Sequence, residues 1–501
     1  MGLEQRSFGV EPWSVRETGL DLDRLGHAES VFALANGHIG LRGNLDEGDP
    51  HGLPGTYLNS FFEHRPLPYA EGGYGYPESG QAILNVTNGK LFRLLVDDEP
   101  LDIRYGELRT HERVLDLRSG TLTRELEWVS PAGKAVRVRS ERLVSLAQRA
   151  VAAISYTVEP VDQPLLVVVQ SQLTANEDLP AGGGDPRVEA ALIRPLLPEG
   201  HVVDDSGVTL LHRVRESGLR MAATMTHDVD GPPGVKTHSS ATEDLGRTTV
   251  ICRLEPGQRL RVVKYLAYGW SSRRSMPALT DQVRAALTVA RYQGWAGLLA
   301  EQRQYLDDFW ASADVEVDGD PQLQQAVRFG LFHVLQAGAR AEGRAIAAKG
   351  LTGTGYDGHT FWDTETFVLP MLSHTIPDAA ADACAGVSKP CPRPANAPAS
   401  WAWPAPRSRG GPSGAWSVPA TGPRGRPPST STRTSPTPRS GTSTPPTTPI
   451  SNARSPVSCW WRPHGCGRHS GSTAPAAASA STGSPGRTST ARSRTTTSTP
   501  T

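Results

Sequence analysis

The sequence predicts a large antiparallel β-sandwich, then a helical segment and the opening of an all-α domain. Strand-like runs, alternating or β-branched and separated by turn sequences, dominate residues 80–268. No long helical pattern interrupts these runs, so we expect the strands to pair antiparallel in packed sheets. After Ser275 the apolar period becomes helical, and beyond residue 383 the composition changes again.

The predicted strands are separated by the turn sequences Pro-Ala-Gly, Gly-Pro-Pro-Gly and Glu-Pro-Gly. Glycine and proline supply the backbone angles that tight turns require, so each of these sequences favours a chain reversal. The clearest strand-like runs cover residues 122–129, 136–144, 151–158, 165–173, 208–214 and 248–268.

Two helices are predicted after the sandwich. Residues 279–310 carry apolar side chains at helical spacing, and we expect Trp295 and Trp310 among them to pack in a core. A second helix is predicted to begin with Asp320 as N-cap and Pro321 at the first helical position, because a capping carboxylate and a proline both favour a helix start.

Charge and cysteine content differ between the two parts of the chain. Residues 384–501 hold 14 of the 51 Lys and Arg residues and none of the 51 Asp and Glu residues, so residues 1–383 carry a net charge of −14. Those residues contain one cysteine, Cys252, which fits a reducing compartment. The start of the chain lacks a secretory pattern, and no apolar stretch is long enough to span a membrane. We therefore expect a cytoplasmic protein without a membrane partner.

Residues 384–501 have the composition of a disordered segment. They contain no Leu, Phe, Tyr or Met and are rich in Pro, Ser, Thr, Gly and Ala, so they cannot bury enough apolar surface to order themselves. A GC-rich coding sequence read in the wrong frame has this composition, and a frameshift is our interpretation. The alternative is a basic arm that binds polyanions, but its arginines are scattered and no nucleic-acid recognition fold is predicted. Cys459, Cys466 and His469 lack a fourth ligand, and no metal site is expected.

The segment from Ala348 to Phe367 contains the motif that indicates chemistry. Three glycines within six residues, beginning at Gly350, favour a tight irregular loop that a ligand can approach. Trp362 then offers a flat apolar face to a sugar ring, and Asp363 offers two acceptors for its hydroxyls. The alternative is a buried tryptophan followed by an aspartate that caps a helix.

Residues 314–374 resemble glycoside hydrolase family 65, the family of maltose, trehalose and kojibiose phosphorylases. The resemblance rests on residues 314–320, 325–329, 348–353 and 358–365, with an upstream match over residues 29–44 and 55–59. It implies a β-super-sandwich, a helical linker and the first helices of an (α/α)6 barrel. The expected domains are residues 1–272 for the sandwich, 273–318 for the linker, 319–383 for a truncated catalytic barrel and 384–501 for the basic tail.

The resemblance implies an inverting phosphorylase that converts an α-glucosidic disaccharide and phosphate into β-glucose 1-phosphate and glucose. Trp362 and Asp363 match the residues that contact the glucosyl unit. No metal or organic cofactor is implied, and phosphate is a co-substrate. The general acid of the family lies in a Gly-x-Asp-Glu-Tyr sequence that this chain lacks, so no catalytic residue is assigned and the chain as written is expected to be inactive. We reject Asp357, Asp363 and Glu365 as substitutes because the family uses these positions to bind or structure the site.

Several alternatives stay open from the sequence. A hydrolase of the same family would use water in place of phosphate, and a non-catalytic sugar-binding protein would need only the sandwich. The linkage could be that of trehalose, maltose or kojibiose, and a homodimer is compatible with the resemblance. His38 and Arg42 lie in a glycine-containing turn that could reach over a barrel mouth, although a purely structural turn is favoured.

Overall fold

A computed structural model describes residues 8–66, 79–178, 194–204 and 207–388. These residues all belong to one compact unit of the chain. The predicted tail lies outside the described residues except at its start, because helix α5 continues through residues 384–388. Helix α5 therefore extends slightly beyond the composition change at residue 383.

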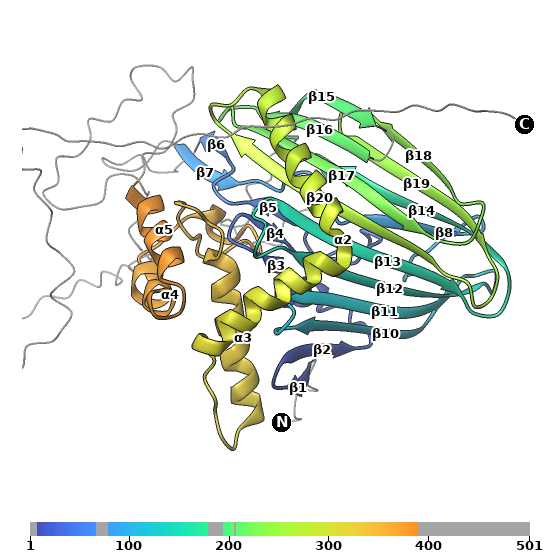
Figure 1. The fold of residues 1–501 in the computed structure, drawn as a ribbon, viewed down its shortest axis with the longest axis horizontal. Coiled ribbons are helices and arrows are strands. Elements are labelled where there is room, and N and C mark those ends of the chain that lie inside the picture. Colours follow the sequence, from blue (N-terminus) through green and yellow to red (C-terminus); the bar gives the residue numbers. More distant parts are fainter. Residues whose placement is uncertain (1–7, 67–78, 179–193, 205–206, 389–501) are drawn as a thin grey trace, which may run out of the picture. The chain divides into compact units, whose positions relative to one another are not determined.

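The larger sheet of the protein has ten strands, in the order β1-β2-β10-β11-β12-β13-β20-β17-β16-β15 (Figure 1). Every neighbouring pair is antiparallel, as the sequence predicted. The strands are β1 (Gly9–Glu11), β2 (Ser14–Thr18), β10 (Glu107–Asp116), β11 (Thr121–Val129), β12 (Ala135–Val144), β13 (Val151–Pro160), β15 (Leu196–Asp204), β16 (Gly207–Val214), β17 (Arg220–Asp230) and β20 (Leu260–Ser271).

A second sheet of five strands has the order β18-β19-β14-β8-β9. Its strands are β8 (Phe92–Val96), β9 (Glu99–Pro100), β14 (Leu165–Thr174), β18 (Lys236–Ala241) and β19 (Leu245–Leu254). Two small sheets complete the strands, formed by β3 (Leu34–Ala35), β4 (Ile39–Leu41) and β5 (Thr56–Leu58), and by β6 (Phe62–Pro66) and β7 (Ser79–Ile83).

The two larger sheets enclose the main hydrophobic core. Val138 and Ile154 from the ten-stranded sheet lie in the same buried cluster as Leu94, Val167 and Val169 from the five-stranded sheet. Side chains alternate along a strand, so every second residue of β12 and β14 can point into this core. This alternation was visible in the sequence, and the predicted sheet-rich N-terminal domain is confirmed.

Helix α2 (Met276–Ala313) follows the last strand and has a break at Gly294, where φ is 69° and ψ is 174°. Its first half packs on the face of the ten-stranded sheet that points away from the main core, through Leu279, Val283 and Leu287. Its second half contributes Trp310 to the main core. Trp295 and Leu298, just after the break, still pack in the same cluster as the first half of the helix, so α2 contributes to both cores without a division at Gly294. The positive φ at the break favours glycine.

Helix α3 (Pro321–Gly338) begins as predicted. The Asp320 carboxylate accepts a hydrogen bond from the Leu323 amide at 2.9 Å, and Pro321 occupies the first turn. The Arg328 guanidinium pairs with Asp314 at 2.7 Å and lies 3.7 Å from the centre of the Trp13 ring. These contacts hold α3 against the N-terminal strands.

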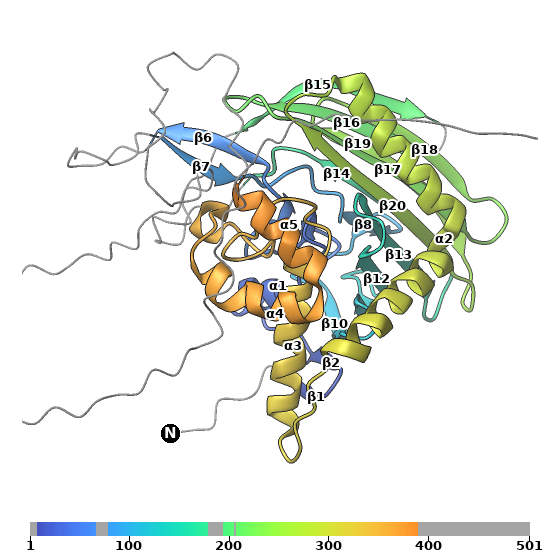
Figure 2. The ribbon, with the colours of Figure 1, turned by 60° about the vertical axis from the view of Figure 1, so that its left-hand side comes forward.

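The remaining helices are α1 (Leu25–Val31), the short turns η1 (Gly355–Gly358) and η2 (Thr364–Val368), α4 (Leu369–Thr375) and α5 (Pro377–Ser388). Helices α4 and α5 lie side by side (Figure 2), and Leu372 of α4 and Ala383 of α5 are buried together with Ile346. Within the part of the chain that the structure describes, no helix is long and apolar enough to cross a membrane. Trp295 and Trp310 are both buried, as predicted.

Candidate functional site

Trp362 and Asp363 lie at the start of η2 and face solvent. The Trp362 side chain is 64% exposed, and Asp363 occupies the N-cap position without a hydrogen bond from its side chain to the turn. A buried tryptophan followed by a capping aspartate does not describe this pair. Both side chains are accessible to a ligand, with one flat apolar face and one carboxylate at consecutive positions.

The backbone around Trp362 is held by its own hydrogen bonds. The Thr366 amide and the Thr366 hydroxyl both donate to the Trp362 carbonyl at 3.0 Å. The Thr360 hydroxyl donates to the Ile346 carbonyl at 3.0 Å, and Thr364 reaches the same carbonyl at 3.4 Å. The exposed pair is therefore displayed by a fixed main chain, which limits the entropy lost when a ligand binds.

The glycine-containing loop before Trp362 is conformationally unusual. Tyr356 and Asp357 have φ values of 58° and 55°, and Gly358 follows with 75°. Residues with a Cβ seldom adopt this left-handed region, and they do so most often where function or packing requires it. A Cβ on Gly358 would lie 2.7 Å from Ile83 of β7, so the loop approaches the sandwich too closely for any other residue.

The sandwich anchors this loop at three points. Nε2 of His359 lies 2.6 Å from the Gln81 carbonyl of β7. The Arg42 guanidinium donates to the Thr352 carbonyl. A Cβ on Gly40 would lie 2.3 Å from the Cβ of Leu351, which explains the glycine. The candidate site is thus positioned by residues that lie some three hundred positions away in the sequence, and no local pattern could have indicated these contacts.

Arg42 is a structural residue. Its side chain is buried and donates to the carbonyls of Gly26 and Leu53 and to the Ser30 hydroxyl at 2.9–3.1 Å. It also pairs with the buried Glu29 carboxylate at 3.3 Å. The Arg42 guanidinium therefore makes its hydrogen bonds and its ion pair with groups inside the protein. This geometry agrees with the favoured interpretation of the turn as structural.

His38 is buried in the same turn, and burial together with the nearby Arg149 guanidinium lowers its pKa well below the usual value. The adjacent Asn36 organises the turn. Its side-chain oxygen accepts from the amides of His38 and Ile39 at 2.9 Å, and its main-chain carbonyl accepts from the Arg340 amide at 2.6 Å. These contacts dock the turn on the segment that follows α3.

The carboxylates near the site do not form an acid–base pair. Asp363 and Glu365 are both exposed, and neither side chain makes a hydrogen bond or ion pair with another described residue that would hold it in place. A general acid that works near neutral pH is typically shielded from water or placed beside another charge. No residue of the described site is therefore assigned to proton transfer.

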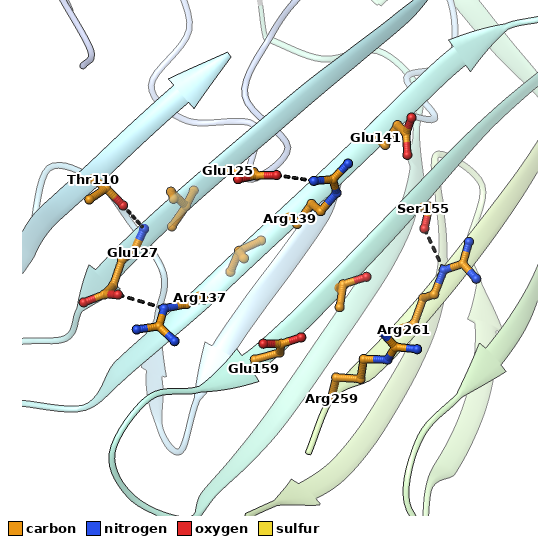
Figure 3. Close-up of a pocket in the computed structure, with 13 residues that line it drawn as sticks. Thr110, Glu125, Glu127, Arg137, Arg139, Glu141, Ser155, Glu159, Arg259 and Arg261 are labelled. Carbon is orange, nitrogen blue, oxygen red and sulfur yellow. Dashed lines mark hydrogen bonds and ion pairs between the residues drawn. The ribbon is translucent and has the colours of Figure 1, made fainter. Parts of the chain in front are cut away.

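A hollow of about 650 Å³ lies elsewhere, on the outer face of β10–β13 and β20 (Figure 3). Arg137 pairs there with Glu127 at 2.9 Å, and Arg139 pairs with Glu125. Figure 3 shows these side chains along neighbouring strands, and the lining contains no aromatic ring. A sheet face with mutually paired charges lacks the flat apolar surface that a sugar ring requires.

Within the described ranges, no three His, Cys, Asp or Glu side chains lie close enough to hold a metal ion. Cys459, Cys466 and His469 lie outside the described residues. Trp362 presents an exposed aromatic ring beside the exposed carboxylate of Asp363.

Comparison with known families gives two matches. Residues 15–309 match the N-terminal domain of glycosyl hydrolase family 65, and residues 328–385 match the central catalytic domain of the same family. The second match includes Trp362 and Asp363. The first match alone covers more than half of the chain.

Individual proteins show the same relationship. An uncharacterized glycosyl hydrolase of Mycobacterium tuberculosis is 66% identical over 381 residues, which are 76% of this chain and 48% of that protein. An alpha,alpha-trehalose phosphorylase of Thermoanaerobacter brockii is 34% identical over 378 residues, 74% of this chain and 49% of the relative. The chain spans about half the length of the curated relatives it matches.

A solved structure of a protein assigned as a kojibiose phosphorylase from the human microbiome has a TM-score of 0.69 at 22% identity. The match covers 77% of this chain and 50% of that one. At this identity the likeness supports the fold alone.

Proposed function

We propose that Trp362 and Asp363 hold a glucosyl unit of an α-glucosidic disaccharide. The chain belongs to glycosyl hydrolase family 65, and this membership supports a sugar as the ligand. The observation that carries the proposal is the exposure of Trp362, 64% of whose side chain faces solvent from a main chain fixed by hydrogen bonds. A pyranose ring can stack on the indole while its hydroxyls donate to the Asp363 carboxylate.

In this proposal, the longer enzyme of which this chain is a part is an inverting phosphorylase. The trehalose phosphorylase relative supports phosphate as the co-substrate, and no metal or organic cofactor is required. Phosphate would attack the anomeric carbon while a carboxylic acid protonates the departing glycosidic oxygen, so no water takes part. Trehalose, kojibiose and maltose are the substrates to compare.

The present chain contributes binding rather than turnover in this proposal. Residues 384–501 contain no Asp or Glu, and the Asp363 and Glu365 carboxylates beside Trp362 are exposed, so neither is suited to act as the general acid. Loss of a general acid costs on the order of 10²–10⁴ in rate. We further propose a cytoplasmic protein that binds small sugars and phosphate, takes no nucleic acid or membrane partner, and can form a homodimer.

Calorimetric titration of the full chain with trehalose, kojibiose and maltose tests the binding site. We expect one of them to bind, with a loss of about tenfold or more in Trp362→Ala and a smaller loss in Asp363→Asn. Phe367→Ala is a matched control, because this neighbouring aromatic side chain is also exposed, at 71%. Equal affinity of Trp362→Ala and the unmodified chain would refute the site, and release of glucose 1-phosphate by the chain would refute its inactivity.

A further inference from the structure

A smaller groove of about 390 Å³ lies between the first half of α2 and strands β15 and β17. Helix α2 runs across these strands in Figure 1, well before the chain reaches the segment that contains Trp362. The groove is lined by polar side chains and by Tyr292. It has no part in the site described above.

Tyr292 is the most prominent feature of this groove. Its side chain is 93% exposed, more than any other large apolar side chain of the described residues. It lies two residues before the break of α2 at Gly294, so the helix turns away directly after it. A single exposed aromatic residue is common on protein surfaces, and the groove beside it is what gives Tyr292 a ligand-binding context.

The helix places polar side chains in line with this ring. Arg284, Thr288 and Tyr292 are spaced by four residues and therefore lie along one face of α2. All three line the groove, while Leu287 below them is buried against the sheet. The groove thus combines an apolar platform at one end with hydroxyl and guanidinium groups along its length.

Two ion pairs fix the orientation of the charged groups. The Arg284 guanidinium lies 3.3 Å from the Asp204 carboxylate. The Arg291 guanidinium lies 2.8 Å from the Asp228 carboxylate, which also accepts from the Tyr265 hydroxyl at 3.0 Å. A guanidinium has five donor hydrogens, so each arginine keeps donors for a ligand while its carboxylate partner holds it in place.

We infer that this groove is a second sugar-binding site, in which a pyranose ring of an α-glucoside chain stacks on Tyr292. Its hydroxyls accept hydrogen bonds from Arg284 and Arg291 and donate one to the Thr288 hydroxyl, whose own hydrogen is donated to the Arg284 carbonyl. The choice of α-glucosides rests on the proposed function, whereas the aromatic platform and polar rim are features of the groove itself. The larger charged groove in Figure 3 has no such ring, which is why the sugar is assigned to the smaller one.

Maltotriose titration of the full chain in a Trp362→Ala background isolates the second site. We expect residual binding in Trp362→Ala, weakened about fivefold or more when Tyr292→Ala is added. Tyr292→Phe keeps the ring and is expected to bind like its parent. Tyr105→Ala is the matched control, because this tyrosine is 65% exposed and does not line the groove.

Each other outcome has a separate meaning. If Trp362→Ala binds no maltotriose, or if Tyr292→Ala and Tyr105→Ala have equal effects in that background, the second site is wrong. If Trp362→Ala alone binds as well as the unmodified chain while Tyr292→Ala loses binding, the second site stands and the proposed role of Trp362 falls. Because Tyr292 is almost fully exposed, its replacement leaves the fold intact, and unchanged thermal unfolding verifies this.

Discussion

The guanidinium of Arg42 donates a hydrogen bond to the main-chain carbonyl of Thr352, across 310 positions of the sequence. The same side chain pairs with Glu29, so a buried charge pair of the sandwich ends on the loop that precedes Trp362. The two parts of the chain that match the family are therefore joined at the place where the candidate sugar site is held.

Replacement of Arg42 by Ala should destabilise the protein by about 3–5 kcal/mol, because the buried Glu29 carboxylate loses its charged partner. Urea unfolding measures this loss. Arg104→Ala is the control, since Arg104 pairs with Asp102 at the surface and should change stability little. Similar losses in the two variants would contradict the structural role of Arg42.

Replacement of Gly40 by Ala should cost about 1–3 kcal/mol, because the added methyl group would overlap Leu351 at 2.3 Å from its Cβ and 2.4 Å from its carbonyl oxygen. Gly330→Ala is the matched control. That glycine lies within α3 with open space around the position of a Cβ, so alanine should be neutral or slightly stabilising there. Thermal unfolding of the two variants should shift in opposite directions.

His111 should make the sandwich sensitive to acid. Its Nδ1 lies 2.9 Å from the Gly19 carbonyl, and its Nε2 accepts from the Arg124 guanidinium at 3.1 Å, so the ring is held neutral. Burial and the Arg124 charge lower the pKa of His111 to about 3. Between that value and an ordinary pKa near 6.5, the unfolded histidine binds a proton that the folded one does not, so stability falls as the pH falls.

Urea unfolding at several pH values between 7 and 4 checks this dependence. His111→Gln should be less stable at pH 7 but lose less stability on acidification, because glutamine does not titrate. His238→Gln is the control, since His238 is exposed and its replacement should leave the pH dependence unchanged. A pH dependence in His111→Gln as steep as that of the parent chain would exclude His111 as its source.

The coding sequence for residues 384–501 offers a separate test of the frameshift interpretation. We expect one of the other two reading frames, starting near codons 375–395, to encode an apolar sequence with acidic residues and a Gly-x-Asp-Glu-Tyr segment. If neither frame contains such a segment, the tail is genuine and a binding role becomes the better hypothesis.

Much of the fold could be predicted because its determinants are local. The alternation in β11 and β12 gave the strands, and Asp320 with Pro321 gave the start of α3. The break at Gly294 was not predicted, because a single glycine within a helical pattern is often tolerated. Its positive φ of 69° became evident only in the folded chain.

The burial and pairing of charged side chains also could not be predicted from the sequence pattern. Arg124 and Arg142 occupy positions in strands where a polar residue suggests solvent, yet both are buried and pair with Asp46. Asp46 is more than seventy positions away from either arginine, so no spacing rule connects them. For the candidate site, the motif indicated Trp362 and Asp363, while the contacts of Arg42 and His359 that support the loop required the folded chain.

The contact between Ala35 and Gln336 has a consequence during synthesis. The Ala35 amide donates to the Gln336 side chain at 2.6 Å, and 301 positions separate the two residues. At a ribosomal rate of roughly 5–20 residues per second, the turn around Asn36 waits about 15–60 seconds for its partner to be made. During that interval the sandwich can assemble while this edge stays open to chaperones, so a nascent chain that stalls before α3 exposes a surface that the finished protein conceals.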